Sequence, residues 1–342
     1  MASYATLLED AMVEEQYKNT TFTELSGCLE SLTAFVNEDT EFNVMISLTE
    51  AESGDIKDKA AKISAAVKKG IQNLIEKIQK FIDMIGEAVK RFVEKAHVVI
   101  ASNGNNAMAK LLKDNSLTIG KDIKLTAVLA KVDKGSGTTK NIKDLFEAAE
   151  TASDTLNKRV GFFKERVDEG TTANWSKVSQ STDMKQADDV IDAFKSDIGT
   201  AEHSDAAMIK AKEAKKVTDV YKNYVAVILD PINDHLKKIE EKCGNAQKTG
   251  KAVIKALQQA EKEGTTAPML SAVSAYVSKV MQLHTYTVNF ASRLLTIATK
   301  NSAKIALAAV DAQGRSAAAA VSGKVKGAKD TVSRKAKAAK EA

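Results

Sequence analysis

One stretch of the chain has the residue types of a phosphate-binding loop, in which backbone amides and a lysine cradle phosphate groups. Gly244 is followed by Lys248-Thr249-Gly250-Lys251, but five residues separate the two glycines where the motif requires four. Ala252 occupies the position at which a Ser or Thr hydroxyl would hold magnesium, and no strand is predicted before the loop. The sequence therefore excludes a nucleotide site here.

The remaining polar residues indicate neither metal binding nor nucleophilic catalysis. The histidines stand apart, with no carboxylate or cysteine at ligand spacing on a shared helix face; they are His97, His203, His235 and His284. We expect His97 and His284, which lie near apolar stripes, at the edge of the core. The cysteines, Cys28 and Cys243, fit no zinc or redox pattern. We predict no metal, no cofactor and no enzymatic activity.

The composition predicts an all-α protein. The 342 residues include only two prolines, and Ala, Lys, Glu, Leu and Val dominate. Few prolines leave helices uninterrupted, and these residue types, apart from Val, are good helix formers. Aromatic residues make up only 5% of the chain, which favours an elongated bundle over a thick globule. We find no secretory signal and no apolar run long enough to span a membrane, so we expect a soluble protein.

The longest amphipathic pattern runs from Asp55 to about Ile100. Its apolar residues, from Ile56 through Ile71 to Phe92, recur at steps of three and four, which places them on one face of an α-helix. Such spacing suits self-association as well as packing within the chain. We divide the sequence into an acidic N-terminal segment, this helix, a helical bundle and a basic tail, at residues 1–50, 51–101, 102–313 and 314–342.

Several shorter helices are predicted around this long one. A helix begins at Thr21 or Thr23 and ends near Val36, and Trp175 is expected to anchor a polar stretch against the bundle. We expect a kink or a break at Asp230-Pro231, because proline removes a backbone hydrogen bond. The other helices are predicted at 4–18, 107–114, 121–133, 142–169, 184–198, 204–243, 246–263 and 269–313.

Charge is distributed unevenly along the chain. Residues 1–50 hold ten acidic residues against Lys18 alone, a net charge of −9, so that the other 292 residues carry +14 and the whole chain +5. Residues 314–342 hold an excess of +6 and little apolar surface, which predicts a flexible tail. Its basic residues are candidate phosphate contacts: Arg315, Lys324, Lys326, Lys329, Arg334, Lys335, Lys337 and Lys340.

The charge reversal coincides with a linker that reads Leu48-Thr49-Glu50 followed by Ala51. This site resembles the Leu/Ile-x-Glu sites cut by the prohead proteases of large tailed bacteriophages, and the basic amphipathic helix behind it is similar to those of their internal head proteins. The same tripeptide pattern occurs at several other places, most of them inside predicted helices, where a protease cannot bind an extended strand. The resemblance covers roughly residues 45–100.

The resemblance implies a structural virion protein inside the phage head, with Leu48 and Glu50 as cleavage determinants and Ala51 as the new N-terminal residue. It implies packaged DNA, bound without sequence specificity, other head proteins and a prohead protease as partners, and the host cytoplasm as the place of assembly. The composition leaves three alternatives open: a coiled-coil interaction protein, an amphipathic membrane-surface protein and a helical pore-forming toxin. Vesicle binding and liposome leakage distinguish the last two.

Overall fold

The computed structural model describes residues 24–37, 56–105, 107–114, 116–126, 142–168, 182–195, 208–263 and 267–341. Nearly all of these residues are helical, which confirms the all-α prediction. The helices are the unlabelled helix 24–37, α3 (Ile56–Asn105), α4 (Ala107–Leu112), α5 (Ile142–Asp168), α6 (Thr182–Lys195), α7 (Val217–Tyr221), α8 (Val227–Glu263) and α9 (Ala267–Glu341).

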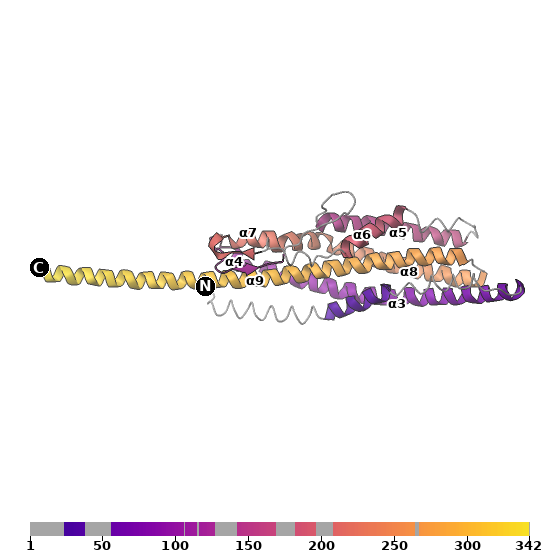
Figure 1. The fold of residues 1–342 in the computed structure, drawn as a ribbon, viewed down its shortest axis with the longest axis horizontal. Coiled ribbons are helices and arrows are strands. Elements are labelled where there is room, and N and C mark those ends of the chain that lie inside the picture. The colour runs from indigo at the N-terminus through magenta and orange to yellow at the C-terminus, as the bar shows by residue number, and fades with distance from the viewer. Residues whose placement is uncertain are drawn as a thin grey trace.

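The molecule is an elongated bundle built on three long helices, α3, α8 and α9 (Figure 1). Gln72 of α3 bonds to Glu261 of α8, and the amide of Gln247 donates to the carbonyl oxygen of Ile82, so these two helices run antiparallel. Helices α5 and α6 pack on each other and on α9, and α5 also contacts α8. One continuous core joins all of these helices with helix 24–37.

Helix α3 confirms the predicted long amphipathic helix as a single element. Its buried residues follow the steps of three and four that were read in the sequence, from Ile71 and Leu74 to Phe92 and Ala96. Gly250 of α8 permits close approach, because a Cβ atom there would lie 3.1 Å from side-chain atoms of Ile78 and of Ile82. The tight α3–α8 contact thus uses a glycine that local propensity would disfavour in a helix.

The region around Pro231 differs from the prediction. Helix α8 continues through Gly244 and Gly250 to Glu263, so the predicted helix end at Gly244 is wrong. The irregularity expected at Asp230-Pro231 lies one turn earlier, in a π-helical segment, Lys222–Ala226. Pro231 has no amide hydrogen, so it cannot donate a helix hydrogen bond to the carbonyl oxygen of Val227, four residues before it. Val227 directly follows the π-helical segment, so the irregular backbone lies next to the position of this missing bond.

A short pair of strands replaces parts of two predicted helices. Strand β1 (Ile123–Lys124) pairs antiparallel with β2 (Met208–Ile209), and Ile123 lies opposite Ile209. Both isoleucines are buried. The helices predicted over 121–133 and 204–243 are therefore wrong at the strand residues, because β-branched side chains are buried here by pairing two segments that lie far apart in the sequence.

The C-terminal tail is helical in the structure, in contrast to the flexible tail predicted. Helix α9 continues without interruption to Glu341, and its last part extends alone beyond the bundle (Figure 1). Ala, Lys and Arg have high helix propensity, and the packed part of α9 already supplies the helical nucleus, so each further residue adds to an existing helix. The helical conformation of the tail therefore follows from local propensity and from its continuity with the packed part of α9.

Candidate functional site

The predicted site residues fall into two groups. Leu48, Glu50 and Ala51 lie outside the described residues, so the predicted cleavage site stays a prediction. The eight basic tail residues all lie in the C-terminal part of α9, the end of which extends beyond the bundle (Figure 1). The structure thus places the candidate phosphate contacts on one helical arm, residues 314–341.

Five of the basic positions of this arm share one helix face. Arg315, Lys326 and Lys337 are spaced by 11 residues, as are Lys329 and Lys340. Because 11 residues make just over three complete turns of an α-helix, these five positions fall within an arc of about 80°. Lys324 and Lys335 lie on the opposite side of the same helix, and they are also 11 residues apart. We call the five positions the basic stripe.

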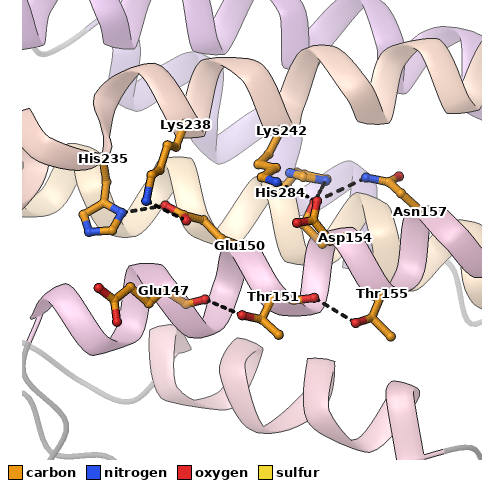
Figure 2. A network of polar contacts seen from close by, with 11 residues as sticks. Glu147, Glu150, Thr151, Asp154, Thr155, Asn157, His235, Lys238, Lys242 and His284 are labelled. Atoms are coloured by element: carbon orange, nitrogen blue, oxygen red, sulfur yellow. Dashed lines mark hydrogen bonds and ion pairs between the residues drawn. The ribbon is translucent and has the colours of Figure 1, made fainter.

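A second group of polar residues lies inside the bundle, where α5 runs beside α8. Figure 2 shows Glu150 of α5 between two α8 side chains: its carboxylate accepts from Nδ1 of His235 at 2.5 Å and from Nζ of Lys238 at 3.1 Å. One turn further along both helices, Lys242 donates to Asp154 at 2.6 Å. We call these contacts between the two parallel helices the polar ladder. Because Glu150 and His235 are largely buried, the ladder fixes the register of α5 against α8.

The ladder ends at a buried group of three residues from three helices. His284 of α9 places Nε2 3.3 Å from Oγ of Ser153 and Nδ1 3.7 Å from Sγ of Cys243. Burial, and after it the charge of Lys242, lowers the pKa of His284 from 6.5 to about 4, whereas burial raises the pKa of the Cys243 thiol to about 12. Both groups are therefore uncharged at neutral pH.

This group has the residue types of a nucleophilic site without the corresponding electrostatics. A reactive cysteine needs a thiolate, usually beside an imidazolium, at a partly exposed position. Cys243, His284 and Ser153 are each no more than 3% exposed. Their arrangement favours a structural role, in which uncharged polar groups satisfy one another across three helices.

The prediction that the histidines are isolated is wrong for two of them. His235 pairs with Glu150 and His284 contacts Cys243, in each case across a helix–helix interface. His284 lies in the core, whereas His97 is exposed. The sequence did contain a signal of this polar interface, because His235, Lys238 and Lys242 of α8 recur at steps of three and four. His203 and Trp175 lie outside the described residues.

Protonation of His284 is expected to destabilise the bundle in mild acid. The folded protein keeps the ring neutral down to about pH 4, whereas the unfolded chain binds a proton below about pH 6.5. The contribution to stability is therefore complete above pH 6.5 and is lost as the pH falls towards 4. In that window the wild type should lose about 1.4 kcal/mol per pH unit more than a His284→Gln variant, measured by urea unfolding. Equal slopes would contradict this assignment.

The described residues form neither a metal-binding cluster nor a membrane-spanning helix. No group of three or more His, Cys, Asp or Glu side chains in these parts of the chain lies close enough to hold a metal ion. Within the same residues, no helix has the length and apolar character needed to cross a membrane. In comparisons with known proteins, no family model, no curated protein and no solved structure matches the chain.

Proposed function

We propose that this chain is a structural protein of a virion, an internal head protein of a tailed phage, that binds packaged DNA through its C-terminal arm. The observation that carries the proposal is the arm itself: a helix that extends beyond the bundle and carries the basic stripe along one face. This part of the helix lies away from the body of the protein (Figure 1), and its excess charge of +6 is the kind that binds a long polyanion.

The dimensions of the arm suit a double helix. At 1.5 Å per residue, successive stripe residues 11 positions apart are separated by about 16 Å along the helix axis. Duplex DNA carries about one charge per 1.7 Å of its axis, so a straight basic helix lying along it finds phosphate groups at every stripe position. Contacts of this kind neutralise phosphates and release counterions, and they carry no information about base sequence.

The arm has an apolar composition that favours a polyanion over a lipid bilayer as its partner. Its apolar positions are small, with valine at Val321, Val325 and Val332 and alanine at most others, and the arm contains no Leu, Ile, Met, Phe, Tyr or Trp. Helices that bind at a membrane interface bury large apolar side chains such as Trp, Phe and Leu. An Ala/Val face gains little from insertion, so phosphate groups are the better-matched partner.

The bundle supports a scaffolding role in this proposal. At its centre His284 contacts both Ser153 and Cys243 as an uncharged group, and this arrangement connects three helices. Long amphipathic helices also offer surface for contacts with other head proteins or with further copies of the chain. A prohead protease that cuts after Glu50 would break the covalent link between the acidic segment of charge −9 and a body of charge +14.

Titration of the intact chain with duplex DNA at several salt concentrations tests the proposal. We expect binding at 50 mM salt, with similar affinity for two duplexes of unrelated sequence and a linear fall of log K with log salt. If five stripe residues each contact a phosphate, the slope is about −4 to −5. Absence of binding at 50 mM salt, or binding only to anionic lipid vesicles, would refute the DNA-binding proposal.

A further inference from the structure

Part of the acidic segment belongs to the core of the bundle. Helix 24–37 buries one face, on which Leu25 and Leu32 are fully buried, Val36 is 1% exposed and Leu29 is 3% exposed. These residues belong to the same continuous core as α3 and α9. Figure 1 shows this helix lying along α3. Burial of this kind is typical of an integral element rather than of a loosely attached leader.

Polar contacts fix helix 24–37 at both of its ends. Near its first residues, Arg91 of α3 donates to Glu24 at 3.2 Å. Near its last residues, the ammonium group of Lys80 of α3 lies 4.8 Å from the centre of the Phe35 ring. Glu24 and Phe35 are 11 residues apart, as are Arg91 and Lys80, so the two helices run antiparallel in one fixed register.

Helix α9 provides the second side of this docking site. The hydroxyl group of Tyr286 donates to Oδ1 of Asn37 at 3.1 Å, and the amide of Asn289 donates to Oγ1 of Thr33 at 3.4 Å. Helix 24–37 thus lies in a groove between α3 and α9, with an apolar base and polar contacts on both walls. The segment has specific contacts of the kind that position a bound peptide helix in a groove.

We propose that helix 24–37 is a docked strap that holds the acidic segment on the bundle after the chain is cut. This inference rests on the proposed cleavage between Glu50 and Ala51. In that step a protease adds water across one amide bond, which leaves a carboxylate on Glu50 and an ammonium group on Ala51. None of the contacts of the strap depends on that bond, so fragment 1–50 stays on the body as a non-covalent subunit.

Charge acts in the same direction as packing. The fragment carries a net charge of −9 and the body +14, so electrostatic attraction adds to the burial of the apolar face. Cleavage alone therefore leaves the acidic residues on the particle. Unmasking of the basic body becomes a separate event, in which the strap leaves the groove between α3 and α9.

The test uses the full-length protein with the recognition sequence of a specific protease inserted after Glu50. After complete cleavage, the two fragments should elute together in size-exclusion chromatography at 150 mM salt in a one-to-one ratio, and they should separate in denaturant. If fragment 1–50 elutes alone while the body keeps its helical circular dichroism spectrum, the strap proposal is wrong. This readout involves no DNA, so its failure is distinct from failure of the DNA-binding proposal.

Two substitutions at adjacent positions separate specific docking from simple charge attraction. Leu32→Asp places a carboxylate on the buried face of the strap, and Ser31→Asp places the same group on its exposed face. We expect the cleaved Leu32→Asp protein to lose fragment 1–50 and the cleaved Ser31→Asp protein to retain it. Retention in both variants would mean that charge alone holds the fragment, and would refute docking in the groove.

Discussion

Replacement of Lys326 and Lys337 by glutamine is expected to weaken DNA binding on the order of a hundredfold at 50 mM salt. Both positions belong to the basic stripe on the arm of α9. Each phosphate contact contributes about 0.9 to the slope of log K against log salt, so loss of two contacts should reduce that slope by about 1.8. Fluorescence anisotropy with a labelled duplex at several salt concentrations measures both quantities.

The matched control for this prediction is the pair Lys324→Gln and Lys335→Gln. These residues have the same side chain and the same spacing of 11, and their replacement removes the same charge, but they lie on the opposite side of the helix. If the arm lies along DNA with one face, this control should keep nearly the wild-type affinity. Equal losses in the two double variants would mean that the arm acts through its total charge, without a preferred face.

The sequence predicted those features of the fold that depend on local chemistry. The spacing of three and four residues in α3 requires no knowledge of a partner, and the helix 24–37 was expected from a threonine cap at Thr21 or Thr23. The continuity of α8 could not be predicted in this way. Gly244 and Gly250 are unfavourable in an isolated helix, and the close contact of Gly250 with α3 exists only in the folded protein.

The polar contacts within the bundle were missed for a related reason. Ser153 and His284 are separated by 131 positions in the chain, and Cys243 and His284 by 41. No local window contains both partners, so each residue looks unpaired in the sequence. The concentration of basic residues in the tail is evident from the sequence alone. Their common face could not, because it depends on the tail being helical.

Asn301 illustrates how one such distant contact organises the end of the bundle. This residue of α9 is fully buried, and its side chain accepts from the backbone amide of Thr126 at 2.9 Å. Its own amide group donates to the carbonyl oxygens of Thr126 at 2.8 Å and Tyr224 at 3.0 Å. One side chain thus joins α9 to the segment after β1 and to the π-helical turn that precedes α8.

Asn301→Leu is therefore expected to lower the free energy of unfolding by about 3–5 kcal/mol. Leucine has a similar volume but leaves one amide and two carbonyl groups without their partner, and each unsatisfied buried group costs about 1–3 kcal/mol. Urea unfolding measures the change, with Asn223→Leu, at an exposed asparagine of the π-helical turn, as the control that should stay within about 0.5 kcal/mol of wild type. A loss below about 1 kcal/mol at Asn301 would mean that water replaces these hydrogen bonds, and that the end of the bundle is held by its apolar contacts alone.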